Sequence, residues 1–317
     1  MTQPSAFEKR VKRQVTAREH DAFAVTAPGL EPLCARELGQ LGPPPAAIET
    51  TKGGVAFRGR LTTVYLANLH LRTATRVRMR LTDFKATRLD QIHRRLVDFP
   101  WELYLFQGQA CEIQVSTRGS RLYHREAIAD QLRGAMAKRL AREGIPAAQT
   151  PAAQGLHLRL DGDRATLSLD SSGAALYRRG FKSQGTRAPL RENLAAAILL
   201  WAGYRPGEPL VDPLCGGGTF SLEAALMTLG IPPGLRRSFA FEGWPAFRPH
   251  HWDHLRQQAA PAAGPSTPPI FASDRSAAAC NALATEVRRT GLDKAIHISR
   301  REFDSLTPAD LPLPDAK

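Results

Sequence analysis

The segment Leu210–Phe220 decides the fold, and its sequence is Leu-Val-Asp-Pro-Leu-Cys-Gly-Gly-Gly-Thr-Phe. Its first residues predict a short buried strand, the glycines a turn, and the apolar pattern of residues 221–229 a helix. Three consecutive glycines let the backbone pass close to a ligand and adopt positive φ angles. The N–H groups at the start of the helix attract an anionic or polar group, while Asp212 faces a cationic or hydroxylated one. The segment therefore predicts a site for a small-molecule cofactor.

Three kinds of cofactor site contain such a turn. A P-loop needs Lys and then Ser or Thr after the glycines, because the lysine neutralises phosphates, but Thr219 and Phe220 follow here. A dinucleotide fingerprint, G-x-G-x-x-G, would use Gly216 and Gly218, but its third position is Ser221. The full pattern, Asp-Pro-x-Cys-Gly-x-Gly-Thr, resembles the first motif of class I methyltransferases, which bind S-adenosylmethionine. A glycine turn without a ligand is the alternative, and the combined pattern favours the cofactor site.

Size and charge limit the classes of partner. The 317 residues suffice for two or three domains, and 43 Lys and Arg against 30 Asp and Glu give a formal net charge of +13. Such an excess favours polyanions, and nucleic acid first in a cytoplasmic enzyme, which is the location we expect. No apolar run approaches the length of a membrane span. Residues 1–19 predict a solvated basic tail and not a secretory signal.

The cysteines and histidines show no metal-binding pattern. Cys34, Cys111, Cys215 and Cys280 include no C-x-x-C pair, which favours reduced thiols over disulfides or a zinc site. The histidines have no ligand spacing either, and no acidic or thiol residue completes a ligand set with the cluster at residues 250–254. We therefore expect no metal.

The first half of the chain alternates strands and helices. Residues 23–26 and 54–57 predict strands, and residues 30–41 and 62–71 predict helices, which together suggest a small ferredoxin-like unit. Further along, the sequence predicts a strand at residues 110–116, a helix at 125–142 and a hairpin at 156–169 that turns at Asp161-Gly162-Asp163.

Residues 76–81 are a first candidate for contact with RNA. They alternate strictly, so that Arg76, Arg78 and Arg80 share one face of a predicted strand and apolar side chains share the other. Arginines spaced by about 6–7 Å suit a phosphate backbone, and a solvated sheet face is equally compatible with the pattern.

A second candidate lies between the two halves of the chain. Residues 176–182 interleave Tyr and Phe with Arg178, Arg179 and Lys182, which can stack on bases and bind phosphate. We interpret this segment mainly as a strand that joins two domains with its charges in water, and secondarily as an RNA contact.

The second half predicts a parallel sheet. After the glycine motif, the sequence predicts a strand that ends in Asp274, a helix at residues 277–290 and a third strand at 296–298. Strands that alternate with helices are typical of a doubly wound α/β sheet. A carboxylate at the end of the second strand can accept both ribose hydroxyls, which is the role expected of Asp274. Asp304 falls where the end of the third strand would meet an adenine.

Five motifs follow one another along the chain. They are Phe-Ala-Val-Thr-Ala-Pro-Gly-Leu-Glu at 23–31, Ser-Ser-Gly at 171–173 with Leu-Tyr-Arg-Arg-Gly-Phe at 176–181, Arg-Ala-Pro-Leu-Arg-Glu-Asn-Leu-Ala-Ala at 187–196, the glycine motif, and Phe-Ala-Phe-Glu at 239–242. In this order they resemble the THUMP-domain RNA methyltransferases, and most closely the bacterial large-subunit ribosomal RNA guanine-N2 methyltransferases. The resemblance covers nearly the whole chain past residue 20.

The resemblance implies a two-part architecture, a cofactor and a partner. It implies an α+β ferredoxin-like and THUMP module over residues 20–170 that holds RNA, a connector at 171–188, and a Rossmann-like, doubly wound α/β methyltransferase domain over 189–317. It implies S-adenosylmethionine as cofactor and ribosomal RNA as partner. The residues it implies for cofactor binding are Pro189 and Asn193 in a segment that closes over the site, Asp212, Pro213, Cys215, Gly216, Gly218 and Thr219 in the glycine motif, Asp274 at the ribose and Asp304 at the adenine.

The catalytic loop of that family is absent from this sequence. The family grips the amine of the base with an Asn/Asp-Pro-Pro-Tyr/Phe loop after the fourth strand. The pairs Pro232-Pro233 and Pro268-Pro269 lack the acid or amide before them and the aromatic after them. We therefore expect no catalytic residue within residues 1–317 and an incomplete methyltransferase domain. A fragment of a longer enzyme is favoured over a truncated protein that binds without catalysing.

The predicted activity is direct transfer of a methyl group from S-adenosylmethionine to N2 of a guanine in large-subunit ribosomal RNA. Positioning would be the main contribution of the protein. One alternative is a non-catalytic RNA-binding protein, against which the retained carboxylates and glycines argue. Another is an adenine-N6 methyltransferase acting on DNA, for which the sequence offers no element that would read a duplex groove.

Overall fold

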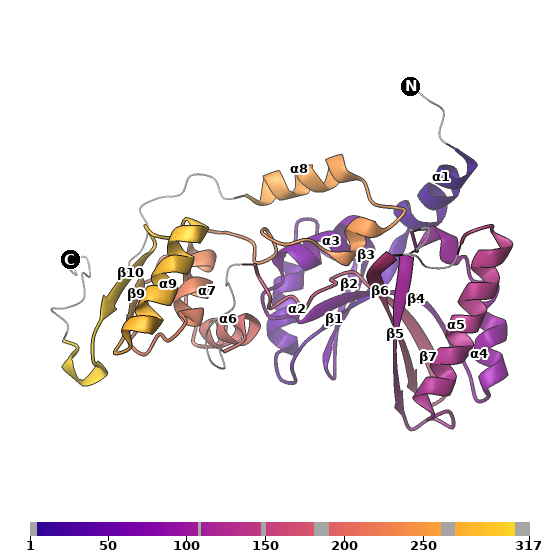
Figure 1. Ribbon diagram of the computed structural model, residues 1–317, viewed down its shortest axis with the longest axis horizontal. Coiled ribbons are helices and arrows are strands. Elements are labelled where there is room, and N and C mark those ends of the chain that lie inside the picture. Colours follow the sequence, from indigo (N-terminus) through magenta and orange to yellow (C-terminus); the bar gives the residue numbers. More distant parts are fainter. Residues whose placement is uncertain (1–4, 107–108, 147–149, 181–189, 261–269, 308–317) are drawn as a thin grey trace.

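The computed structural model describes residues 5–106, 109–146, 150–180, 190–260 and 270–307, and Figure 1 shows their arrangement. A ferredoxin-like unit forms first. Its elements are β1 (Glu19–Val25), α2 (Glu31–Gly39), β2 (Ala47–Thr51), β3 (Gly54–Arg60), α3 (Leu61–His70) and β4 (Arg76–Lys85). Strand β1 pairs antiparallel with β3 and β4, and β2 adds to the outer edge of β3. The sequence predicted this fold but missed β2, whose side chains are nearly all exposed and do not alternate.

The sheet continues into a second group of elements. They are α4 (Leu89–Leu96), the 3₁₀ turn η2 (Trp101–Leu103), β5 (Gln109–Arg118), α5 (Arg125–Arg142), β6 (Thr150–Asp161) and β7 (Arg164–Asp170). Within the described residues, one seven-stranded sheet results, in the order β2-β3-β1-β4-β7-β6-β5. The predicted hairpin is confirmed, because β6 and β7 pair antiparallel and Gly162 and Asp163 both have positive φ in the turn.

Alternation along these strands separates two faces of the sheet. One face is apolar and packs with helices α3, α4 and α5 into a single core. The side chains on that face include Ala22, Ala24, Val77, Met79, Leu156, Leu158, Leu160, Leu167 and Leu169, all at most 1 % exposed. The opposite face has the intervening polar side chains. The alternation of apolar and polar residues along each strand thus determines which side chains lie on each face of the sheet.

The predicted solvated tail at residues 1–19 is wrong for the part that the structure describes. Residues 5–16 form helix α1 (Ala6–Val11) and the π-helical turn η1 (Lys12–Thr16). Val11 and Val15 are each 1 % exposed in the core, and Arg10 lies 2.7 Å from the Glu102 carboxylate. The four-residue spacing of the two valines places them on one helical face, and this apolar pair outweighs the basic composition.

The second half forms a Rossmann-like α/β unit. Its elements are α6 (Glu192–Trp201), β8 (Leu210–Asp212), α7 (Thr219–Thr228), β9 (Ile270–Asp274), α9 (Ala277–Thr290), β10 (Ile296–Arg300) and the 3₁₀ turn η4 (Phe303–Ser305). The three strands are parallel, as the sequence predicted, and they lie in the order β10-β9-β8. Among the described residues, α7 and α9 pack against the face that holds Ile270 and Ile296, while Val211 on the other face is 41 % exposed.

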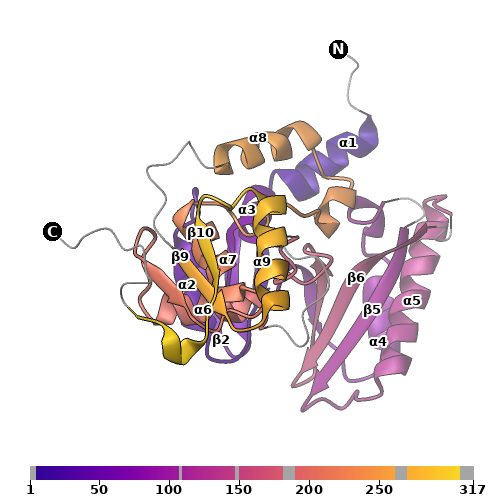
Figure 2. The same cartoon turned by 60° about the vertical axis from the view of Figure 1, so that its left-hand side comes forward.

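The segment between Pro232 and Ala260 packs on the first module and not within the unit that flanks it in sequence. It contains the 3₁₀ turn η3 (Ala240–Gly243) and helix α8 (Pro249–Ala259), which lies over α3 in Figures 1 and 2. The ring of Phe241 is fully buried and stacks on that of Tyr65 at 4.2 Å. Residues 189–317 therefore do not pack as one separate unit, because this aromatic segment belongs to the core of the first module.

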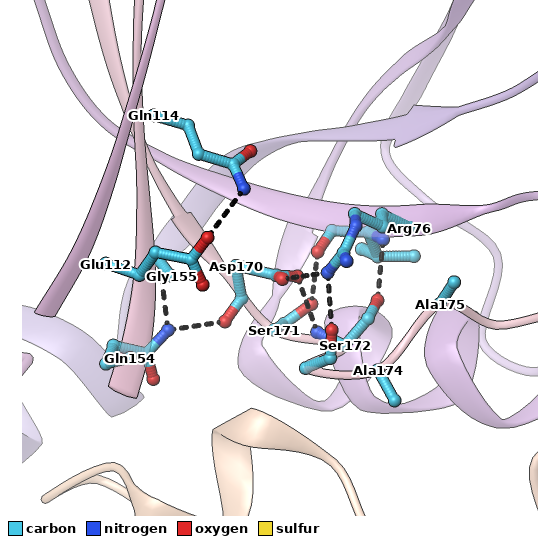
Figure 3. Close-up of polar contacts among 12 residues, drawn as sticks. Arg76, Glu112, Gln114, Gln154, Gly155, Asp170, Ser171, Ser172, Ala174 and Ala175 are labelled. Carbon is cyan, nitrogen blue, oxygen red and sulfur yellow. Dashed lines mark hydrogen bonds and ion pairs between the residues drawn. The ribbon is translucent and has the colours of Figure 1, made fainter. Parts of the chain in front are cut away.

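The connector is a partly buried loop over its described residues 171–180, and the predicted joining strand is wrong. Ser171 donates its backbone N–H to Val77, and its hydroxyl accepts from the Asn68 amide at 2.8 Å. The Ser172 hydroxyl donates to the side-chain oxygen Oδ1 of Asn68 at 2.6 Å. Figure 3 shows the start of this loop beside Asp170, whose carboxylate accepts from the backbone of Ser172. Hydrogen bonds from side chains replace strand pairing here.

Candidate cofactor site and basic sheet face

The glycine loop joins the end of β8 to the start of α7. Cys215 donates its N–H to the carbonyl group of Ser273 on β9 at 2.9 Å, and Gly218 donates to Cys215 at 2.7 Å, which closes a tight turn. Gly216 and Gly218 have φ angles of +50° and +68°, in the left-handed region where a side chain is strained. Both glycines are therefore needed for the path of the loop, as the sequence predicted.

The two glycines differ in their surroundings. A Cβ at Gly218 would lie 2.2 Å from a methyl carbon of Leu283, because α9 packs tightly there. A Cβ at Gly216 would meet no atom within 4 Å. The backbone at Gly216 thus borders open space in which a ligand can approach, while Gly218 serves the packing of the loop on α9.

Asp274 and Gly216 meet at the carboxyl ends of β8 and β9. The N–H of Gly216 donates to Oδ2 of Asp274 at 3.0 Å, and the N–H of Ser276 donates to Oδ1 at 2.8 Å. A carboxylate has about four lone-pair sites, so two donors leave acceptor capacity. The structure thus brings together two residues that lie 58 positions apart and were predicted for one site.

Asp212 lies beside the first turn of α7. It is 9 % exposed, and Oδ2 accepts from the Ser221 hydroxyl at 2.8 Å. Burial raises the pKa of the Asp212 carboxyl, and the nearby Asp274 carboxylate adds to this effect. A buried carboxylate with a single side-chain donor would gain from a cationic partner. The sequence analysis did not single out Ser221, although a polar residue in the first turn of an otherwise apolar helix is a usable signal.

The other residues predicted for the cofactor have varied positions. Pro213 and Thr219 flank the glycine turn, and Cys215 is 7 % exposed, with the pKa of its thiol raised by burial to about 12. Asp304 is exposed in η4, in the segment that follows β10. Asn193, at 1 % exposure, faces the first module, where its amide lies 3.5 Å from the carbonyl oxygen of Thr73. Pro189 lies outside the described residues.

Arg179 is not available to RNA in this structure. Its side chain is 2 % exposed, forms an ion pair with Glu223 at 3.1 Å and donates to the carbonyl group of Leu176. Its place in the predicted RNA-binding set is therefore wrong for a physical reason: a buried guanidinium paired with a carboxylate cannot reach a phosphate. Arg178 is exposed, and Lys182 lies outside the described residues.

The three arginines of β4 lie on the polar face of the sheet, as predicted. Arg76 is tied to the connector, because it lies 2.5 Å from the Asp170 carboxylate and also donates to Gly173 (Figure 3). Arg78 and Arg80 have no carboxylate partner among the described residues, and the Arg80 guanidinium covers the ring of Phe23 at 5.3 Å. The two differ from Arg76 in being free to bind an anion.

The described part of the chain also bears on metals and membranes. No group of three His, Cys, Asp or Glu side chains in it is placed to hold a metal ion, and its four cysteines are all free thiols. None of its helices combines the length and the apolar composition needed to span a bilayer.

The fold and this loop define a class: a Rossmann-like methyltransferase unit preceded by a ferredoxin-like module. Two family models match the chain accordingly. The one described as "RMKL-like, methyltransferase domain" matches residues 179–312, and the one described as "RlmL ferredoxin-like domain" matches residues 21–78.

Relatives and solved structures agree with these matches. The chain is 38 % identical to the Ribosomal RNA large subunit methyltransferase K/L of Syntrophotalea carbinolica over 90 % of its own length and 41 % of that protein. It is 33 % identical to a Synechocystis protein named as an RNA methyltransferase, over 90 % of its own length and 75 % of that protein. A crystal structure of SMU.472, described as a methyltransferase complexed with SAH, superposes with a TM-score of 0.81 at 27 % identity, over 92 % of this chain and 77 % of that one.

The chain therefore belongs to the RlmKL-like family of RNA methyltransferases. It spans about two fifths of the length of the K/L methyltransferases that it matches.

Proposed function

We propose that this chain binds S-adenosylmethionine at the glycine loop and RNA on the first module, for methyl transfer to N2 of a guanine in large-subunit ribosomal RNA in the cytoplasm. The observation that carries the cofactor assignment is the hydrogen bond between Gly216 and Asp274, which sets a bare backbone and a carboxylate side by side at the strand ends. Ligands of open α/β sheets bind at this edge. The names of the relatives support the choice of RNA as substrate.

The residues at the site fit the proposed cofactor. Asp274 retains acceptor sites for two ribose hydroxyls, and the open space beside Gly216 admits a ligand to the backbone. Among the described residues, no side chain caps the first turn of α7, so a carboxylate of the ligand can lie at the positive end of the helix. Asp212 supplies a carboxylate for an ammonium group. S-adenosylmethionine, when bound, supplies a methyl group already activated as a sulfonium.

The role of this chain is then to bind and to position. Asp274 orients the nucleoside part of the cofactor, Asp212 its amino acid part, and the loop between them sets the distance from the sheet edge. We assign no described residue to gripping the base amine. Asp304 and Asn193 are proposed as further cofactor contacts, together with Pro189, Pro213, Cys215 and Thr219.

We also propose a division of the chain that follows these roles. Residues 20–170 hold RNA, and the unit that contains β8, β9 and β10 binds the cofactor. The segment with η3 and α8 packs on the RNA-holding module, with Trp252 at 3 % exposure in the aromatic cluster beside Tyr65. Segments of each half thus stabilise the other.

Methyl incorporation into RNA tests the function. Large-subunit ribosomal RNA from cells that lack the modification would be incubated with labelled S-adenosylmethionine and the longest natural protein that contains this sequence. Nucleoside analysis should find the label in N2-methylguanosine, and Asp274→Ala should reduce it about tenfold or more when the cofactor is limiting. Label in N6-methyladenosine would favour the adenine methyltransferase instead, and an absence of label with intact RNA binding would favour the non-catalytic RNA-binding protein.

A further inference from the structure

The polar face of the seven-stranded sheet is hollowed where five strands meet. A groove of about 410 Å³ crosses β1, β4, β7, β6 and β5 on the face opposite the helices. Its basic side chains are Lys52, Arg78, Arg80, Arg118, Arg159 and Arg164. The alternation that buries the apolar side chains on the other face gathers these cations on this one.

Several of these cations have no internal counter-charge. Arg159 pairs with Asp161 at 2.6 Å and Arg164 pairs with Asp83, so these two are partly neutralised. In the part of the chain that the structure describes, no carboxylate lies within ion-pair distance of Lys52, Arg78, Arg80 or Arg118. Partial burial lowers the pKa of Arg78, because the charged guanidinium is poorly solvated there and has no close carboxylate. An anion in the groove would stabilise that charge.

The groove also contains a guanidinium plane, backed by an aromatic ring, on which a base can stack. Phe23 of β1 lies in its wall, half-buried, with the Arg80 guanidinium 5.3 Å from its centroid. Aromatic rings and guanidinium planes on open sheet faces are the usual platform for unstacked bases, whereas duplex RNA offers its phosphates and sugars. A hollow of about 410 Å³ is the size of about one or two nucleotides.

A second hollow lies further along the same face. It measures about 310 Å³ and shares Arg78 and His157 with the first. Glu112, Gln114 and Asp170 line it, and Figure 3 shows them around the Arg76 side chain. Carboxylates repel phosphates and accept hydrogen bonds from the amino groups of bases. This second hollow therefore combines the cations Arg76 and Arg78 with carboxylates that can accept from base edges.

We infer that this groove binds a single-stranded segment of the RNA substrate, with phosphates on Arg78, Arg80 and Arg118, a base against Phe23, and a further base edge in the hollow lined by Glu112 and Asp170. The inference rests on the proposed RNA substrate. It adds Phe23 and Arg118 to the RNA-binding residues that the sequence indicated. It leaves out Arg76 and Arg179, which form ion pairs within the protein.

Salt-dependent binding tests the inference. Fluorescence anisotropy would follow oligouridylate of about twelve nucleotides, and a duplex of equal length, on the full chain at several salt concentrations. Each lost phosphate contact lowers the slope of log K against log salt by about 0.7 for a single strand, so the triple variant Arg78→Ala, Arg80→Ala, Arg118→Ala should flatten it by about 2.

A matched control changes the same net charge on the helical side. Arg94, Arg133 and Arg142 lie on α4 and α5 in ion pairs with Asp90, Glu126 and Asp98, and their triple alanine variant should retain the wild-type slope. Phe23→Leu should weaken single-strand binding without altering the slope. Calorimetric titration with S-adenosylhomocysteine in each variant separates this inference from the cofactor assignment.

Three results would overturn the inference: equal slopes for the two triple variants, tighter binding of the duplex, or no RNA binding by the wild-type chain. None of them alters the cofactor assignment if S-adenosylhomocysteine still binds. If the wild-type chain does not bind S-adenosylhomocysteine, the proposed function itself is wrong.

Discussion

Arg179 of the connector and Glu223 of helix α7 form an ion pair at 3.1 Å, with side chains only 2 % and 1 % exposed. Arg72 of the ferredoxin-like unit lies 3.7 Å from the second oxygen of the same carboxylate and donates to the carbonyl group of Ile231 beyond the end of the helix. The helix that starts at the glycine loop is therefore held by two cations from outside its own unit. These contacts hold the glycine loop at a fixed position relative to the ferredoxin-like unit.

Glu223→Gln should destabilise the protein strongly, because it leaves two buried guanidinium groups without their shared counter-charge. Loss of one partner from a buried ion pair costs about 3–5 kcal/mol, and urea denaturation would measure it. The control is Glu126→Gln, in an ion pair on the exposed side of α5 with a side chain 80 % exposed. If both variants unfold at the wild-type urea concentration, the buried cluster does not anchor α7.

Substitutions at the two loop glycines should separate binding from folding. Gly216→Ala should lower stability by about 1–2 kcal/mol, the cost of a left-handed backbone, while it blocks the open space and weakens S-adenosylhomocysteine binding. Gly218→Ala adds a collision with Leu283 and should lose about 3 kcal/mol or more. Urea denaturation and calorimetry on each variant check the two effects. An equal loss of stability in both variants would contradict the claim that only Gly218 is packed against Leu283.

Asp212→Asn should raise the stability of the protein and lower its affinity for the cofactor. Burial raises the pKa of Asp212 above its usual 3.8, so the group disfavours the fold once it ionises. Its favourable contribution is complete below the unfolded-state pKa and is lost as pH rises through the folded-state pKa. The variant should therefore gain stability relative to wild type across that acidic window and keep the gain at neutral pH. It should also bind S-adenosylmethionine more weakly there, because the ammonium loses its counter-charge.

Urea denaturation of both proteins between acidic and neutral pH would check the first effect, and calorimetry at neutral pH the second. A stability difference that does not change with pH would mean that Asp212 has the same pKa in the folded and unfolded states, so that burial does not raise it. Unchanged affinity would place the cofactor ammonium elsewhere.

Much of the cofactor site could be predicted from the sequence because its parts are local. The strand, the glycines and Asp212 occur within nine residues, and parallel strand order alone brings the end of β9, with Asp274, beside them. The alternation at residues 76–80 likewise fixed the face on which the arginines lie. Short-range periodicity and a common topology therefore accounted for most of the fold.

What the sequence did not reveal depends on distant partners. The basic and aromatic pattern around Arg179 suggested a solvated strand, since nothing nearby indicates that Glu223, 44 residues later, neutralises it. Similarly, the predicted domain at residues 189–317 includes the aromatic residues near Phe241, but their partner Tyr65 lies in the ferredoxin-like unit. The solvated tail was predicted from the basic composition of residues 1–19, and the helical spacing of Val11 and Val15 was not taken into account.

Binding of S-adenosylmethionine at the glycine loop can be measured by calorimetric titration of the wild-type chain, of Asp274→Ala and of the triple alanine variant at Arg78, Arg80 and Arg118. The account predicts one site per chain in wild type. Loss of a charge-assisted hydrogen bond, about 1.5–3 kcal/mol, should weaken binding about tenfold or more in Asp274→Ala, while the triple variant binds normally. Absence of binding in wild type, or equal affinity in Asp274→Ala, would contradict the assignment of the glycine loop as the methyl-donor site.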